Sequence, residues 1–219
     1  MLFRYPVLSV VACLFPLLVG AQERGDLLIA TEQITDEVFT ETVILLLHYA
    51  DDGAVGVAIN RPTWVTTTEL FPELDDVHRY RGPVFHGGPL AQATVLALSS
   101  SGRLAEGDRE PIIDGVYMSS NLDLFESLVE EMNDDAQLRF YAGHASWGPG
   151  QLDEELASGA WRTATASASL IFDADPSSLW DRLTAPGAGM TVREDPAAAP
   201  QPAQAQTGLT LHEAYANAE

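Results

Sequence analysis

The chain of 219 residues lacks lysine altogether: its eleven basic residues are all arginine, against 32 aspartates and glutamates, and its formal net charge at pH 7 is −21. A protein that binds nucleic acid needs a basic patch to meet the phosphate backbone, and the sequence offers none. We therefore expect no nucleic-acid partner. An acidic surface of this kind keeps a protein soluble through self-repulsion, or adapts it to salt.

Cysteine is nearly absent as well. Cys13 is the only one, so the chain cannot form an internal disulfide and has no cysteine pair for a zinc site. Without the segment that contains Cys13, the chain would have no cysteine at all. Such a composition fits an oxidising compartment and the cytosol equally well.

Long apolar runs are confined to the N-terminus. Arg4 provides a short positive start, residues 7–19 are apolar, and Val19-Gly20-Ala21 offers small residues at a cleavage point. The run is too short for a membrane span and is interrupted by Pro16. We predict a signal peptide over residues 1–21, a periplasmic or secreted protein, and no stable membrane span after cleavage.

Three alternatives remain open for this segment. Val10-Val11-Ala12-Cys13 resembles a lipoprotein processing box, which would retain Cys13 as a lipid anchor, although the apolar run continues through residues 14–19. The second alternative is an uncleaved tail on a cytosolic protein. The third is a misassigned start of the chain. The next methionine is Met118, so only a start other than methionine fits the last case.

The rest of the chain predicts one domain and a tail. A hydrophobic share of 46% and an aromatic share of 8% support a real core, and the length suits one domain, which we place at residues 22–185. From residue 186 the composition shifts to alanine, proline, glutamine and glycine, which predicts a disordered tail over residues 186–219. Residues 209–216 alone suggest a short helix or a partner-binding tag.

Strands and short helices alternate along the predicted domain. An Asp52-Gly53 pair between two apolar runs predicts a hairpin. Capping boxes at Thr66–Glu69 and Ser120–Asp123, and the Asp175-Pro176 pair, predict the starts of three helices. The apolar runs predict strands at residues 26–30, 43–49, 54–60, 83–86, 93–98, 112–118, 137–142, 161–166 and 170–172.

The stretch from residue 137 to residue 158 organises the chain. We predict a strand over residues 137–142, then a glycine-rich turn from Gly143 to Gly150, then a short helix over residues 151–158. Binding sites are commonly built where such a turn follows a strand. His144, Ser146 and Trp147 would lie in this turn.

Four motifs give the chain a resemblance to a known family. They are residues 25–30, residues 48–62, Gly87-Gly88-Pro89, and residues 143–155 followed by Trp161. In this order and spacing they are similar to the AlgH/YqgE family, also called UPF0301. The resemblance implies an α+β fold, a mixed β-sheet with packed helices, and a regulatory label linked to alginate production. It also implies a cytoplasmic location, which most of the family has. This location is the alternative to the export predicted above.

The family commonly has tyrosine and glycine where this chain has His144 and Ser146, so chemistry read from these two residues would not be a property of the family. We predict a cleft formed by the loops of residues 60–62, 87–89 and 143–151, in which Arg61 contacts an anion or carboxylate and Trp147 forms an apolar wall. The predicted binding residues are Asn60, Arg61, Gly87, Gly88, His144, Trp147 and Gln151. The glycine motifs are equally explained by sharp backbone turns alone.

Catalytic alternatives are weaker. Phosphate at the turn would meet Asp153, Glu154 and Glu155. Ser146 resembles a nucleophile, but His144 on the same stretch is poorly placed as its base. No histidine or cysteine pair has metal-ligand spacing, so we expect no cofactor and no metal. We predict a protein that binds a small molecule or a protein partner; the alternative is a hydrolase or metal-assisted enzyme that uses His144 with Ser146 or His86.

Overall fold

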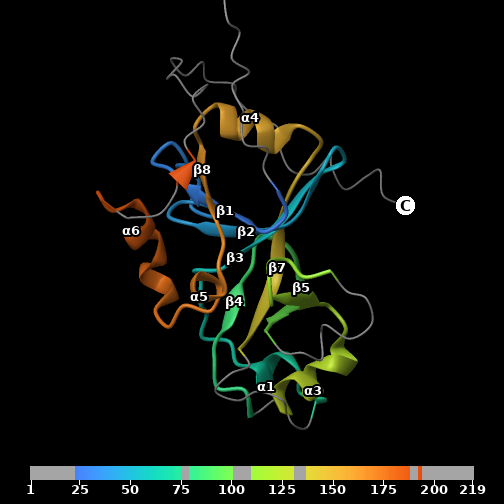
Figure 1. The fold of residues 1–219 in the computed structure, drawn as a ribbon. Helices are drawn as coiled ribbons and strands as arrows, with labels where there is room; N and C mark the ends of the chain where they lie inside the picture. Colours follow the sequence, from blue (N-terminus) through green and yellow to red (C-terminus); the bar gives the residue numbers. More distant parts are fainter. Residues whose placement is uncertain (1–22, 75–78, 101–109, 131–136, 188–191, 194–219) are drawn as a thin grey trace, which may run out of the picture.

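The computed structural model describes residues 23–74, 79–100, 110–130, 137–187 and 192–193 (Figure 1). The predicted signal peptide, Cys13 and residues 209–216 lie outside the described residues. Within the described ranges, no helix is long and apolar enough to span a membrane.

The described strands form one sheet, in the order β6-β5-β7-β3-β2-β1-β8-β9, with β4 paired to β7 off this path. All pairs are antiparallel except β4–β7, which is parallel, so the predicted α+β fold with a mixed sheet is confirmed. The strands are β1 (Asp26–Ala30), β2 (Val43–Ala50), β3 (Gly53–Ala58), β4 (Val84–His86), β5 (Leu90–Ser99), β6 (Tyr117–Ser119), β7 (Leu138–Trp147), β8 (Trp161–Thr165) and β9 (Val192–Arg193).

The helices are short and lie around the sheet. In Figure 1, α4 lies at one end of the molecule, α1 and α3 lie at the other end, and α5 and α6 lie along one side. The α-helices are α1 (Thr67–Leu70), α3 (Phe125–Glu130), α4 (Gln151–Ala157), α5 (Ala168–Ile171) and α6 (Leu179–Thr184), and the 3₁₀ helices are η2 (Leu122–Leu124) and η3 (Pro176–Ser178).

Strand β7 is longer than predicted, and this changes the predicted turn. It continues to Trp147, so His144, Ser146 and Trp147 lie in a strand, and the turn contains only Gly148, Pro149 and Gly150. Gly143 does not end the strand because its positive φ of 74° fits an irregularity in the pairing, where β5 shifts register between Leu90 and Val95. The prediction of a turn beginning at Gly143 was therefore wrong.

Three smaller predictions were also wrong. Residues 112–116 form a tight turn instead of a strand, because Gly115 adopts a φ of 72° there, and only Tyr117–Ser119 is extended. The segment predicted as a strand at residues 170–172 falls largely in helix α5. The second helix is capped by Asn121, whose side-chain oxygen accepts from the amide of Asp123 at 3.0 Å, and not by Ser120.

Local signals elsewhere were read correctly. The β2–β3 hairpin turns at residues 51–52, and Thr66 and Glu69 form a reciprocal capping box at the start of α1. Strand β9, by contrast, pairs with β8 although it lies in the segment predicted to be a disordered tail.

The core has three parts, and β7 contributes to all of them. Tyr141 belongs to the largest cluster, with residues of β1, β2 and α6. Phe140 belongs to a second cluster with α3, and Trp147 belongs to a third with α4 and β8. The long strand thus connects the two ends of the molecule.

Candidate functional site

The side chains of Asn60 and Arg61 form hydrogen bonds with the residues just before and at the start of β2. The Asn60 side chain accepts from the Val43 amide at 2.9 Å and donates to the Glu41 carbonyl at 2.9 Å. Arg61 donates from Nε to the Thr42 hydroxyl at 2.9 Å and from Nη2 to the Thr40 carbonyl. Partial burial lowers the pKa of Arg61, and the nearby Glu41 carboxylate opposes this shift. Both side chains therefore hold the loop before β2.

The three predicted loops do meet, but through backbone atoms: the His86 amide, next to Gly87, donates to the Arg61 carbonyl at 2.9 Å. Gly87 donates its amide to Ala142 at 2.8 Å. A Cβ at Gly87 would lie 2.3 Å from the Gly143 carbonyl oxygen, and one at Gly88 would lie 2.2 Å from the His144 carbonyl carbon. Glycine is required here because two backbones pack in direct contact. A ligand therefore cannot enter between the backbones of residues 87–88 and 143–144.

Trp147 and Gln151 belong to a polar cluster around Glu155. The indoles of Trp147 and Trp161 both donate to Glu155 Oε2, at 2.9 and 2.8 Å. Gln151 donates to Glu155 Oε1 at 3.0 Å and accepts from the Gly148 amide at 3.1 Å. The two indole rings meet edge to face at 6.1 Å. This cluster attaches α4 to the end of the sheet.

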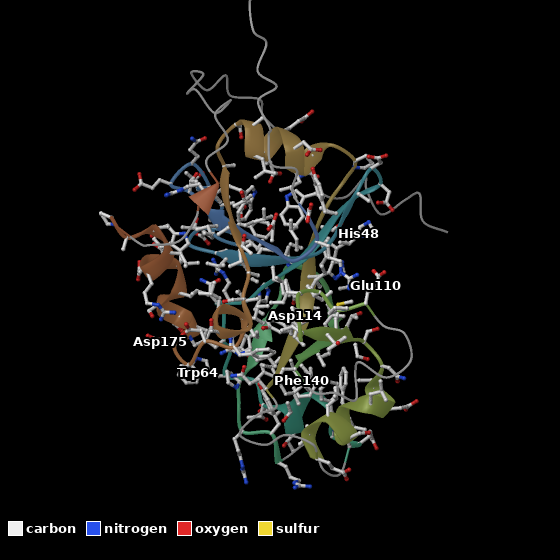
Figure 2. The ribbon with its side chains drawn as sticks, in the orientation of Figure 1. His48, Trp64, Glu110, Asp114, Phe140 and Asp175 are labelled. Atoms are coloured by element: carbon white, nitrogen blue, oxygen red, sulfur yellow. The ribbon has the colours of Figure 1, made fainter. Side chains whose placement is uncertain are left out.

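The histidines and Ser146 do not form a catalytic arrangement among the described residues. No hydrogen bond joins His144 to Ser146 there, and burial lowers the pKa of His144. His86 lies 3.4 Å from the Gln92 side chain. His48, labelled in Figure 2, pairs with Asp52 at 2.8 Å. No group of three metal-ligating side chains occurs in the described ranges.

Strand spacing separates His48 from Ser146. His48 lies opposite Val55 in β3, and Val55 lies opposite Ser146 in β7. Neighbouring strands are roughly 4.8 Å apart, so the backbones of His48 and Ser146 are roughly 9.6 Å apart. That separation is too large for a serine–histidine hydrogen bond between two side chains that stand parallel on a sheet.

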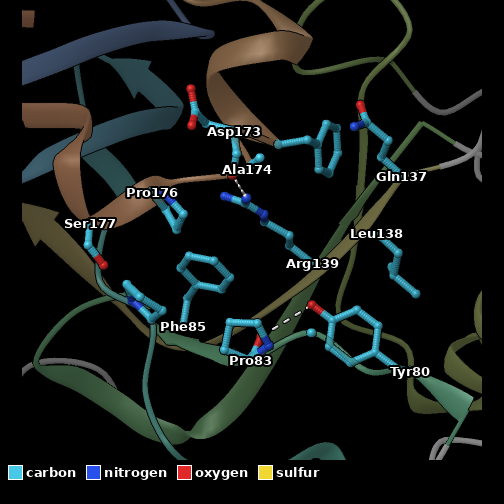
Figure 3. A pocket seen from close by; sticks show the side chains of 13 residues that line it. Tyr80, Pro83, Phe85, Gln137, Leu138, Arg139, Asp173, Ala174, Pro176 and Ser177 are labelled. Atoms are coloured by element: carbon cyan, nitrogen blue, oxygen red, sulfur yellow. Dashed lines mark hydrogen bonds between the residues drawn. The ribbon is translucent and has the colours of Figure 1, made fainter. Parts of the chain in front are cut away.

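A pocket of about 470 Å³ lies elsewhere, between β4, the start of β7 and the segment from α5 to η3 (Figure 3). Its volume is in the range of small-molecule sites. Most of its walls are proline, phenylalanine and other apolar side chains. The lining residues are Pro62, Tyr80, Gly82, Pro83, Phe85, Gln137, Leu138, Arg139, Phe172, Asp173, Ala174, Pro176 and Ser177.

Arg139 is the only cation among the described residues that line this pocket, and it is only 8% exposed. Its Nη1 donates to the Ile171 carbonyl at 2.8 Å, and its Nη2 donates to the Asp173 carbonyl. The guanidinium carbon lies 4.6 Å from the centre of the Phe85 ring. Figure 3 shows the side chain reaching into the middle of the pocket. No carboxylate of the described residues pairs with it.

Two buried tyrosines lie near this guanidinium. Burial raises the pKa of Tyr80 to about 12, and Arg139 opposes the shift. Burial also raises the pKa of Tyr141, against the same opposing charge. Tyr80 donates to the Pro83 carbonyl at 3.2 Å, whereas the Tyr141 hydroxyl, among the described residues, has no partner with hydrogen-bond geometry. Both phenols remain protonated donors at neutral pH.

The pocket wall formed by Asp173 is held from the outside as well. The Asp173 carboxylate pairs with Arg182, and it accepts from the Asp175 amide at 2.8 Å. Arg182 also donates to Ser178 at 2.8 Å. Because Asp173 is paired with Arg182, its carboxylate does not neutralise Arg139.

The sequence contains a signal for this pocket that motif reading missed. Arg139 interrupts the apolar run of residues 137–142, and a charged residue in a buried strand is rare without a purpose. Pro62 belongs to one of the predicted loops and Phe85 lies next to another, and both line the pocket. The predicted binding residues themselves do not line it.

Sequence comparison identifies the family of this fold. A model of the AlgH-like family matches residues 27–189. The chain belongs to the AlgH-like family. UPF0301 proteins of Streptomyces coelicolor and Myxococcus xanthus are both 33% identical to it, over 160 and 158 residues; these cover 71% of this chain in each case, and 82% and 85% of those proteins.

Solved structures of the AlgH-like fold agree. The solution structure of AlgH from Pseudomonas aeruginosa is 27% identical, with a TM-score of 0.58 over 68% of this chain and 80% of that one. The crystal structure of protein DIP2367 from Corynebacterium diphtheriae is 25% identical, with a TM-score of 0.63 over 76% of this chain and 89% of that one. Membership of the AlgH-like family establishes the fold. An activity has to be argued from the residues of the site.

Proposed function

We propose that this AlgH-like protein is a non-enzymatic ligand-binding protein with a regulatory role, and that its ligand is a small organic molecule with an anionic group. One observation carries the proposal: the buried Arg139 lines a pocket of about 470 Å³, and no carboxylate of the described residues neutralises it. A buried cation is costly unless it is paired, and an anionic ligand would pair it.

The side chains of the pocket favour binding over catalysis. Arg139 and Tyr80 are both hydrogen-bond donors, and burial, which raises the pKa of Tyr80 to about 12, keeps its phenol protonated at neutral pH. The described residues of the lining include no histidine or cysteine that would act as a base or nucleophile. The alternative enzyme, with His144 and Ser146 or His86, would require a site in which these residues are hydrogen-bonded to one another.

A thermal-shift screen of small carboxylates, phosphates and neutral analogues tests the proposal. A ligand at a hundred times its dissociation constant adds about 2.7 kcal/mol, which raises the melting temperature by several degrees. Ala174→Trp places an indole in the exposed wall of the pocket and should abolish the shift. Ala93→Trp, on the exposed part of β5, is the matched control and should preserve it.

The outcomes separate the pocket from the cleft predicted from sequence. A shift that survives Ala174→Trp but disappears in Arg61→Ala or His144→Ala would place the ligand at the loops of residues 60–62 and 143–151. That result would contradict the pocket as the site. An activity that depends on His144 in a correctly folded protein would favour the enzyme.

We also propose that the protein is exported to the periplasm or beyond. The support is the arrangement of Arg4, the apolar residues 7–19 and the small residues at 19–21. N-terminal sequencing of the native protein should find Gln22 as the first residue. A cytosolic protein that retains residues 1–21 would contradict export, and a lipid on Cys13 would indicate anchoring.

A further inference from the structure

We propose that the pocket binds a singly charged carboxylate with a flat apolar body, and that Tyr80 hydrogen-bonds this carboxylate together with Arg139. The inference rests on the proposed function, to which it adds the chemical class of the ligand and a second binding residue. It follows from the charges in the pocket, the shape of its walls and the hydrogen bonds of Tyr80.

The charges favour one negative charge on the ligand. Arg139 is the single cation among the described residues of the lining, and the Asp173 carboxylate of the same lining is already paired with Arg182. A phosphate dianion would leave the pocket with excess negative charge inside a protein whose net charge is already −21. A carboxylate matches one guanidinium in charge and in planar geometry.

The guanidinium has donors left for this carboxylate. Two of its nitrogens donate to the carbonyls of Ile171 and Asp173. A guanidinium carries five N–H groups, so donors remain for other acceptors even beside the Tyr141 hydroxyl, which also interacts with the Arg139 side chain. One face lies near the Phe85 ring, with 4.6 Å between the guanidinium carbon and the ring centre. The remaining N–H groups lie in the guanidinium plane, where a ligand oxygen can accept them.

The walls favour a flat apolar body. Three prolines and two phenylalanines line the pocket, and their rings are rigid. A planar ligand between such surfaces gains contact area while it loses few rotatable bonds on binding. The ligand would thus place its carboxylate at Arg139 and its ring against the prolines and phenylalanines.

Tyr80 is the second donor. Its hydroxyl donates to the Pro83 carbonyl at 3.2 Å, which is long for an O–H···O hydrogen bond. The pKa of about 12 keeps this hydroxyl protonated. A carboxylate accepts hydrogen bonds and donates none, so it complements a guanidinium and a phenol. A short charge-assisted bond to the ligand would replace the long neutral bond to Pro83.

Tyr141 provides a matched control. Its hydroxyl also lies within the electrostatic reach of Arg139, but Tyr141 does not line the pocket and is fully buried. The change Tyr141→Phe removes the same phenolic oxygen as Tyr80→Phe. It should leave ligand affinity nearly unchanged because Tyr141 does not line the pocket, and it reports separately on the interaction of its hydroxyl with the Arg139 side chain.

The test is an NMR titration of the full-length protein with benzoate, cyclohexanecarboxylate, phenyl phosphate and benzamide. Benzoate should shift signals of the pocket residues and bind more tightly than the other three compounds. Tyr80→Phe should raise the dissociation constant for benzoate about tenfold or more, as expected for the loss of a hydrogen bond to a charged group. Tyr141→Phe should change it less than twofold.

Each contrary result would overturn a different part of the proposal. Equal benzoate affinity in wild type and Tyr80→Phe, with binding lost in Ala174→Trp, would overturn the assignment of Tyr80 but keep the pocket. Tighter binding of phenyl phosphate than of benzoate would overturn the carboxylate class, and tighter binding of cyclohexanecarboxylate would overturn the flat body. If none of the three anions bound wild type saturably, the proposed function itself would fail.

Discussion

Glu155 is a single side chain that satisfies two indoles. Trp147 and Trp161 are 5% and 4% exposed, so their N–H groups have little access to water. Both donate to the same carboxylate oxygen of Glu155. An indole N–H that loses its partner in such a place bears the full cost of desolvation. Glu155 should therefore matter far more to stability than its position on a surface helix suggests.

We expect Glu155→Ala to lower the free energy of unfolding by about 2–4 kcal/mol, since it leaves two buried donors without an acceptor. Urea unfolding followed by tryptophan fluorescence measures this directly. Glu154→Ala is the control because Glu154 belongs to the same helix and makes no contact with the indoles; it should change stability by less than about 0.5 kcal/mol. Equal effects of the two variants would contradict the role of Glu155.

Strand β7 is the element that both ends of the molecule share. Its first half pairs with β4 and its second half pairs with β3, while β5 lies along its other edge. Gly143 lies between the two halves with a φ of 74°, and a Cβ there would lie 2.5 Å from the Gly88 carbonyl oxygen. The strand can pass from one half to the other only because this residue has no side chain.

Gly143→Ala should therefore cost more than backbone strain alone. Gly150 has the same φ of 74°, but a Cβ at Gly150 would meet nothing within 4 Å. Gly150→Ala should cost about 1–2 kcal/mol from its left-handed conformation. Gly143→Ala adds a clash with backbone and should exceed that cost by at least about 2 kcal/mol, or prevent folding. Chemical denaturation of both variants checks the difference, and equal costs would show that the close approach is unimportant.

Helices, strands and turns were predictable from the sequence where neighbouring residues determine them. The Asp52-Gly53 pair, the Thr66–Glu69 box and the apolar run of β2 each depend on neighbours in sequence. The extension of β7 past Gly143 depends on β3 and β5, which lie far away in the chain. The pocket was missed for the same reason, because residues 171–177 reach Arg139 only through the fold. Arg139 itself was visible in the sequence as a charge in an apolar run.

Across the whole molecule, repulsion between acidic side chains lowers the stability of the folded state. The formal net charge is −21 and the sequence pI is about 4.3, so acidic side chains repel one another at neutral pH. Among the described residues, the Arg24–Glu110 ion pair is exposed, and a pair of this kind contributes little. Stability at pH 7 should thus depend strongly on screening by salt.

We expect the melting temperature at pH 7 to rise by several degrees when sodium chloride is raised from roughly 0.01 M to 1 M, because the screening length falls from about 30 Å to about 3 Å. The same comparison near pH 4.3, where the net charge approaches zero, is the control, and the rise should shrink there. Calorimetry in both buffers measures the two effects. A melting temperature that is constant or falls with salt at pH 7 would show that the acidic surface is not under net repulsion. An equal rise at both pH values would instead indicate a general salt effect on apolar burial.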